Sequence, residues 1–156
     1  MNRRLNVAIY LALIVTMCDQ LSKWVIINQV SPPPRGIPVN AFFSLVLVEN
    51  RGITFGLLSR FDPHVTLYFL LGTSAIILIL LGRWLLHTHS MTVAVGLGLI
   101  IGGAIGNVID RLRFGAVIDF LDFHIGDYHW YSFNLADSAI VIGVTLLLTD
   151  SLIRGR

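Results

Sequence analysis

The hydrophobic pattern of the chain is dominated by four long apolar stretches, at about residues 5–30, 65–81, 91–109 and 133–153. Each stretch approaches the ~20 residues that a helix needs to cross a bilayer. The segments between them are short, the longest being residues 31–64. We therefore expect a single membrane domain over residues 1–156, an all-α integral membrane protein of four transmembrane helices with a small β hairpin or sheet region.

The β region is predicted at about residues 37–60 and 112–132, where the helical pattern breaks. Phe42 to Val48 is aromatic and β-branched, which is typical of a strand. Asn-Arg-Gly at 50–52 then signals a turn, after which residues 53–58 can return as a second strand. We expect this hairpin to lie on the membrane, and its asparagine and glycine serve either the turn alone or binding.

A second polar segment precedes the last helix. Residues 115–125 partly alternate between polar and apolar, which predicts a short strand or loop along the interface. The aromatic residues at 128–133 favour the head-group level of a membrane. The last helix then begins near Asn134, with Asp137 three residues later, the spacing of a capping box. A helix cap and a functional site are both open interpretations of these two residues.

Charged residues interrupt the first apolar stretch near its end. Asp19 and Lys23 lie one helical turn apart on the same face, so an ion pair between them makes both charges tolerable. The same pair lies far along the helix from Arg4 and can also support a site near the far surface of the membrane.

The third apolar stretch combines close packing with charge. Its glycines at 98, 102 and 106 have the four-residue spacing that lets membrane helices approach closely. They lead directly to Asn107, Asp110 and Arg111. Ionisable groups near hydrocarbon are costly and usually face a protein interior or a water-filled site, so these residues indicate function. A polar cap with ordinary interfacial charges is the alternative.

An up-and-down bundle places all of these polar residues at one end. Asp19 and Asn107 come late in outgoing helices, and Asp137 comes early in a returning one. The arginines on the side of the two termini are concentrated in far fewer residues than those on the other side. By the positive-inside rule, both termini are predicted to be cytoplasmic, so the polar cluster and the β region are extracytoplasmic.

Composition agrees with a membrane protein and narrows the chemistry. The chain is 55% hydrophobic and 13% charged, with a mean hydropathy of +0.78. Its net charge of +2 gives no reason to expect nucleic-acid binding, and the single cysteine, Cys18, has no internal disulfide partner. His87 and His89, and likewise His124 and His129, lack the spacing of metal ligands, so no metal or other cofactor is expected.

Taken together, the motifs of this chain resemble the lipoprotein signal peptidase family, the type II signal peptidases of bacteria. The resemblance covers nearly the whole chain in the right order and rests on Asp19-Gln20-x-x-Lys23, Asn50-x-Gly52-x-x-Phe55-Gly56, Gly103-x-x-Gly106-Asn107-x-x-Asp110-Arg111-x-x-x-Gly115-x-Val117-x-Asp119-Phe120, and Phe133-Asn134-x-Ala136-Asp137. Residues 53 and 54 depart from the small residues that are common in the family at these positions.

The resemblance implies an aspartic endopeptidase of the bacterial inner membrane, with Asp119 and Asp137 as the catalytic pair. It would cut a prolipoprotein on the amino side of its diacylglyceryl-modified cysteine. Two carboxylates forced together share one proton, as an acid–base couple requires. By the same resemblance, the residues that shape the site and hold substrate are Asn50, Gly52, Asn107, Arg111, Asn134 and Ala136, and those that support it are Asp19, Lys23, Gly103 and Asp110.

The expected partners are prolipoprotein signal peptides that carry a diacylglyceryl cysteine, together with membrane lipid, and the protein is expected to act as a monomer. From the residues alone, two other classes stay open. A small four-helix proton-coupled transporter would also bury acids, but near the bilayer midplane. A non-catalytic membrane scaffold would explain the glycines but not two acids that arrive at one level from separate segments.

Overall fold

The structure is a computed structural model that describes residues 3–30, 36–52 and 62–154. Four of its helices are long and apolar enough to cross a membrane, and a small antiparallel sheet accompanies them. In chain order the elements are α1 (Arg3–Gln29), β1 (Ile37–Asn40), β2 (Phe43–Asn50), α2 (Pro63–His87), α3 (Met91–Phe114), β3 (Val117–Ile125), β4 (Tyr128–His129) and α4 (Leu135–Arg154).

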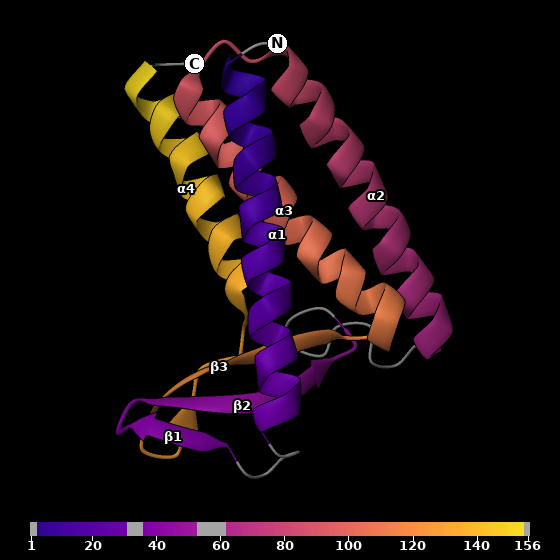
Figure 1. Ribbon diagram of the computed structural model, residues 1–156, viewed down its shortest axis with the longest axis vertical. Helices are drawn as coiled ribbons and strands as arrows, with labels where there is room; N and C mark the ends of the chain where they lie inside the picture. The colour runs from indigo at the N-terminus through magenta and orange to yellow at the C-terminus, as the bar shows by residue number, and fades with distance from the viewer. Residues whose placement is uncertain (1–2, 31–35, 53–61, 155–156) are drawn as a thin grey trace.

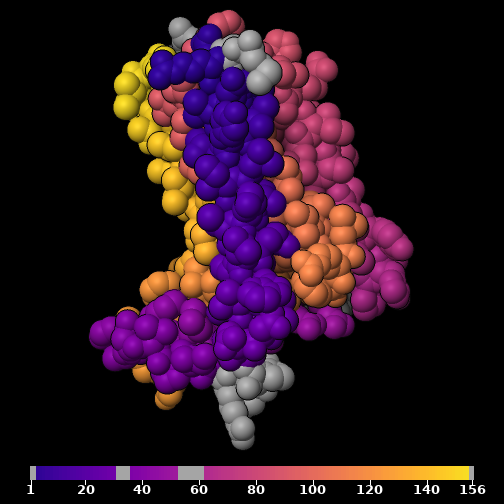
Figure 2. Space-filling model, viewed as in Figure 1, coloured from indigo at the N-terminus to yellow at the C-terminus, as the bar shows by residue number. Residues whose placement is uncertain are grey.

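The helices form a bundle in which α3 is central. Half of the most apolar segment of α3 is buried, compared with 11% for α1 and α2 and 17% for α4. The chain termini lie together at one end of the bundle, and the sheet lies across the other end (Figure 1). Strands β1 and β2 project sideways beyond the helices (Figure 2). Because so little of α1, α2 and α4 is buried, these outer helices present apolar side chains to their surroundings, as expected in lipid.

Glycines on α3 bring its two main neighbours into close contact. A Cβ atom on Gly98 would lie 2.9 Å from the Cα atom of Ala8, and one on Gly102 would lie 2.8 Å from the Cα atom of Ala12. On the other face of α3, Gly96 meets the carbonyl oxygen of Gly143 on α4. The predicted small-residue packing is therefore confirmed, and it continues onto a second face of the helix.

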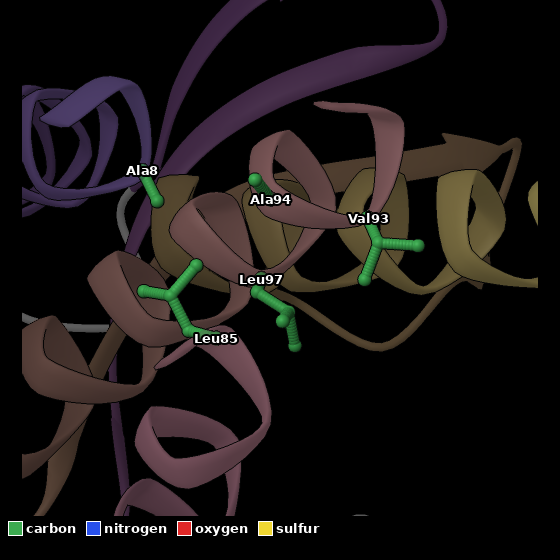
Figure 3. Close-up of a cluster of buried hydrophobic side chains, with 5 residues drawn as sticks. All are labelled: Ala8, Leu85, Val93, Ala94 and Leu97. Carbon is green, nitrogen blue, oxygen red and sulfur yellow. The ribbon is translucent and has the colours of Figure 1, made fainter. Parts of the chain in front are cut away.

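The hydrophobic core near the termini is built from small and branched side chains of α1, α2 and α3, namely Ala8, Leu85, Val93, Ala94 and Leu97 (Figure 3). Leu147 of α4 packs against this cluster. Helix α3 begins here with a cap, because the Ser90 hydroxyl accepts a hydrogen bond from the Val93 amide.

Two helix ends differ from the sequence prediction. Helix α2 continues past Leu81 to His87, so that His87 lies in its last turn instead of in a loop. Arg83 and Trp84, which follow the apolar stretch, do not end the helix, since neither breaks backbone hydrogen bonding. Helix α3 continues to Phe114 and ends at Gly115, whose φ of 69° is the left-handed conformation that glycine adopts readily. Asp110 and Arg111 therefore lie within α3.

The sheet has the strand order β1-β2-β3-β4, and all of its pairs are antiparallel. The strand predicted from Phe42 is confirmed as β2, but its hairpin partner is β1, which precedes it. The side chain of Asn40 accepts a hydrogen bond from the Phe42 amide at 2.8 Å and closes that turn. The returning strand predicted at 53–58 lies outside the described residues. Pairing of β2 with β3 places Val48 opposite Asp119.

Candidate active site

A group of buried polar side chains lies where the sheet meets the helices. It contains Asp19 and Lys23 from α1, Asn107 and Asp110 from α3, Asp119 from β3, and Asn134 at the start of α4, each at most 8% exposed. Burying so many polar groups is stable only when each finds partners, and the contacts below supply them. The geometry thus brings together residues from four segments that the sequence placed at one end of the bundle.

Asp119 is held by two amide side chains. Asn50 donates from Nδ2 to its Oδ2 atom at 3.0 Å, and Asn134 donates from Nδ2 to its Oδ1 atom at 2.7 Å. Burial, and to a lesser extent the nearby negative charge of Asp137, raise the pKa of Asp119, whereas the two amide hydrogen bonds and the positive charge of Lys23 lower it. The net result is a pKa of about 6, well above that of an ordinary aspartate.

Asp137 lies in the first turn of α4 and faces the same group. Its Oδ1 atom accepts from Asn107 Nδ2 at 2.9 Å, and its Oδ2 atom accepts from the backbone N–H of Asn134 at 3.2 Å. The Asp137 amide in turn donates to Asn134 Oδ1 at 2.9 Å. This reciprocal pair is the capping box that the spacing predicted. The cap is not an alternative to a site, because Asn134 also donates to Asp119 and so contacts both carboxylates.

Lys23 joins two buried carboxylates. Its Nζ atom lies 2.9 Å from Asp19 Oδ2 and 2.6 Å from Asp110 Oδ2, and the lysine side chain is 2% exposed. The same Nζ atom donates to Asn107 Oδ1 at 3.2 Å, which fixes the orientation of that amide. The predicted ion pair with Asp19 is confirmed, whereas the sequence did not identify Asp110 as the second partner.

The two carboxylates bound by Lys23 also hold the backbone beside Asp119 and Asp137. Asp19 Oδ1 accepts a hydrogen bond from the N–H of Ala136 at 3.0 Å, and Asp110 Oδ2 accepts one from the N–H of Ile118 at 3.1 Å. Each of these amides belongs to the residue immediately before one of the two aspartates. Lys23 therefore connects, through one carboxylate on each side, to the backbone that positions both of them.

Two glycines allow this close approach. A Cβ atom on Gly103 would collide with the carbonyl oxygen of Ala136, and one on Gly106 would lie 2.5 Å from Asp19 Oδ2. Gln20 is a participant that the sequence reasoning quoted without a role. It donates to Asp110 Oδ1 at 2.8 Å and to the carbonyl oxygen of Gly106 at 3.2 Å. An amide next to Asp19 inside an apolar helix was the available signal.

The remaining predicted residues lie at the edge of the group. Arg111 is half-buried and donates to the carbonyl oxygen of Asn107 at 3.4 Å. The Gly52 amide donates to Asn50 Oδ1 at 3.2 Å, so Asn50 closes its own turn with one atom and contacts Asp119 with another. The turn role of Asn50 is therefore confirmed, and its contact with Asp119 is compatible with a role in the site.

His124 and His129 lie on β3 and β4 and make their contacts apart from Asp119 and Asp137. His124 and His129 stack with ring centroids 4.9 Å apart across β3 and β4, and His129 pairs with Asp122 at 2.8 Å. Within residues 3–30, 36–52 and 62–154, no three His, Cys, Asp or Glu side chains are arranged to hold a metal ion. The group of amides and carboxylates is suited instead to proton transfer, with two acids held close together by neutral donors.

Comparison with known proteins identifies relatives over almost the entire chain. The family model described as signal peptidase (SPase) II matches residues 11–153. The lipoprotein signal peptidase of Burkholderia cenocepacia strain J2315 is 48% identical over 149 residues, which cover 94% of this chain and 87% of that protein. The Burkholderia multivorans lipoprotein signal peptidase is 47% identical with the same coverage.

Solved structures agree with the sequence relatives. Two bacterial membrane enzymes whose structures were determined by the in meso method superimpose with TM-scores of 0.82 and 0.83. They are 31% and 29% identical to this chain, cover 94% of it, and are themselves covered to 88% and 93%.

Proposed function

The chain belongs to the lipoprotein signal peptidase family, and we propose that it works as an aspartic peptidase with Asp119 and Asp137 as its acid–base pair. The protein is a membrane protease that removes signal peptides from prolipoproteins. The single observation that carries the catalytic assignment is Asn134, which donates a hydrogen bond from its side chain to Asp119 and from its backbone to Asp137.

The proposed reaction uses one proton shared by the two carboxyl groups. The ionised carboxylate removes a proton from a water molecule, whose oxygen attacks the scissile carbonyl carbon. The protonated carboxyl group donates its proton to the carbonyl oxygen, which gives a tetrahedral diol. As the diol collapses, one of its hydroxyl groups returns a proton to the ionised carboxylate, and the protonated carboxyl group gives its proton to the leaving nitrogen. The carbon–nitrogen bond breaks, and the pair again holds one proton. The raised pKa of Asp119, about 6, supports this proposal, because its carboxyl group keeps a proton to a higher pH than an ordinary aspartate does.

The amide side chains around the pair are proposed to hold both it and the substrate. Asn107 and Asn134 orient the carboxylates, and an amide does this without adding charge. Asn50, at the end of β2, is proposed to contact the bound peptide near its lipidated cysteine, because it borders Asp119 and lies at the edge of the group. Gly52, Arg111 and Ala136 complete the substrate side of the site in this proposal.

The protein is a multi-pass protein of the bacterial inner membrane. We propose that both termini face the cytoplasm and that the aspartate pair lies near the outer face, where the sheet rests on the bilayer. The proposed partners are prolipoproteins with a diacylglyceryl cysteine, acted on by a monomer without a cofactor. The transporter alternative has no support from the relatives, and the buried acids gather where the sheet meets the helices, instead of in the middle of the bundle.

The catalytic assignment is tested with Asp119→Asn and Asp137→Asn, measured by cleavage of a lipid-modified prolipoprotein. Each variant should accumulate in the membrane and lose cleavage by a factor on the order of 10³ or more. Asp122→Asn is the matched control, since Asp122 is also buried on β3 but pairs with His129. Cleavage retained by either test variant, or lost equally in the control, would contradict the assignment.

A further inference from the structure

A cavity of about 590 Å³ is lined by residues at the ends of α2 and α4 and the start of α3. This end of the bundle carries the chain termini and lies opposite the sheet (Figure 1). The cavity wall is formed by the last turns of α2, the connection from α2 to α3, the start of α3 and the last turns of α4. Cavities of this size hold small-molecule ligands. The catalytic proposal makes no use of this region, so anything that binds here has a separate role.

The wall of the cavity is amphipathic. Trp84, Val93 and Leu147 form its apolar part, and Val93 lies on the α4 side of the core cluster drawn in Figure 3. Polar side chains of the α2–α3 connection and of α4 form the remainder, with Asp150 and Arg154 as its charged members. Tryptophan favours the head-group level of a bilayer, so the cavity lies where polar and apolar parts of a lipid meet.

The charged part of the wall is arranged around Arg154. Its Nε atom pairs with Asp150 Oδ1 at 2.9 Å, and the Ser90 hydroxyl donates to the same oxygen at 3.0 Å. The Arg154 side chain is 49% exposed, so this end of the helix presents its guanidinium to the membrane interface. Arg4 of α1 donates to the carbonyl oxygen of His89, which places a second arginine beside the cavity. Arg4 thus adds a second guanidinium group beside the Asp150–Arg154 ion pair.

We propose that this cavity binds an anionic phospholipid, with the phosphodiester at Arg154 and Arg4 and an acyl chain along Trp84 and Leu147. Basic pockets between transmembrane helices at a membrane surface take acidic head groups in this way. A soluble phosphate ester shares the head-group chemistry but would leave the apolar wall uncovered. The lipid would join α1, the α2–α3 connection and α4 at the end of the bundle where the sheet provides no connection.

The test is a lipid titration of the purified full-length protein in detergent, followed by native mass spectrometry. Phosphatidylglycerol, zwitterionic phosphatidylcholine and soluble glycerol phosphate are compared. Arg154→Gln should weaken phosphatidylglycerol binding about five-fold, the effect of one interfacial basic residue. Asp150→Asn should strengthen it, because it removes the negative charge from the wall. Arg3→Gln is the matched control, since Arg3 is exposed at the same end of the bundle and outside the cavity wall.

The opposite signs of the two substitutions separate lipid binding from a structural role of the ion pair. If Asp150 and Arg154 only stabilised the fold, both variants would lose binding together. The proposal is overturned by that result, by equal binding of the anionic and zwitterionic lipids, or by an equal loss in Arg3→Gln. Glycerol phosphate binding as tightly as the lipid would also overturn it and would assign the cavity to a soluble ligand.

Discussion

At the residue scale, Asn50 connects the environment of Asp119 to the pH dependence of cleavage. In the proposed mechanism the pair acts with one proton, so kcat/KM should fall as the pH rises through about 6, where Asp119 is expected to lose its proton. The hydrogen bond from Asn50 favours the ionised form of Asp119 and lowers its pKa. Asn50→Ala should therefore raise the pKa of Asp119 and shift the alkaline limb to higher pH.

This shift is measured in pH profiles of kcat/KM for the wild type, Asn50→Ala and the control Asn28→Ala. Asn28 is exposed and its side chain donates to the carbonyl oxygen of Trp24, so its loss should leave the profile unchanged. An alkaline limb that stays in place or moves to lower pH in Asn50→Ala would contradict the electrostatic role given to Asn50.

Contacts within one segment could be predicted at this scale, and contacts between segments could not. The spacing of Asn134 and Asp137 predicts the reciprocal cap because both residues belong to one helical turn. The pairing of Lys23 with Asp110 depends on how α1 is rotated against α3. Helix α1 has apolar side chains on all of its faces, so its sequence does not define which face turns toward α3.

At the element scale, Lys23 is expected to hold β3 and α4 in place through Asp110 and Asp19. Lys23→Met leaves two buried carboxylates without their cation, which should lower the free energy of unfolding by about 3 to 5 kcal/mol and reduce kcat. Thermal unfolding and cleavage are measured together. Arg113→Gln is the control, since Arg113 is an exposed cation near the same end of α3. Unchanged stability and kcat in Lys23→Met would exclude this role.

Close packing of α3 against α1 is tested at Gly106. In Gly106→Ala the new methyl carbon would lie 2.5 Å from Asp19 Oδ2, so the protein should lose about 1 to 3 kcal/mol of stability, the usual cost of overpacking. Gly72→Ala on α2 is the matched control, because a Cβ atom there meets nothing within 4 Å. Equal thermal stabilities of the two variants would show that this approach of the helices is not as tight as described.

The elements themselves follow the sequence wherever a local signal exists. At the start of α2, Asp62 is the cap and Pro63 the first helical residue, and the Asp62 side chain accepts from the amides of His64 and Val65. The sequence prediction ends α2 and α3 too early, because polar residues at the end of an apolar stretch do not stop a helix. The residue that ends α3 is Gly115. Pairing of β2 with β1 and β3 joins distant segments, and strand patterns do not specify such partners.

At the scale of the whole molecule, the orientation in the membrane is the next prediction. In a Cys18→Ser background, a cysteine introduced as Asp127→Cys, in the exposed turn between β3 and β4, should react with an impermeant thiol reagent added outside intact inner membranes. Arg3→Cys, at the opposite end of the bundle, should react only after the membrane is opened. The reverse labelling pattern would place the aspartate pair on the cytoplasmic side.

The four-helix architecture could be read from hydropathy, because only helices and closed barrels satisfy the backbone in lipid. Hydropathy alone does not predict that Asp119 and Asp137 lie in the same group of side chains. An up-and-down bundle puts their segments at one end, but the shared Asn134 and the bridge through Lys23 emerge only when the segments are packed.

The most direct measurement of the central claim is single-turnover cleavage of a lipidated prolipoprotein by Asp119→Asn, Asp137→Asn and the double variant. Two carboxylates that share one proton act as a unit, so each single variant should lose at least about 10³-fold and the double variant should be scarcely worse. Losses that multiply in the double variant would mean that the two aspartates act independently. Either single variant cleaving within about tenfold of the wild type would remove that residue from the catalytic pair.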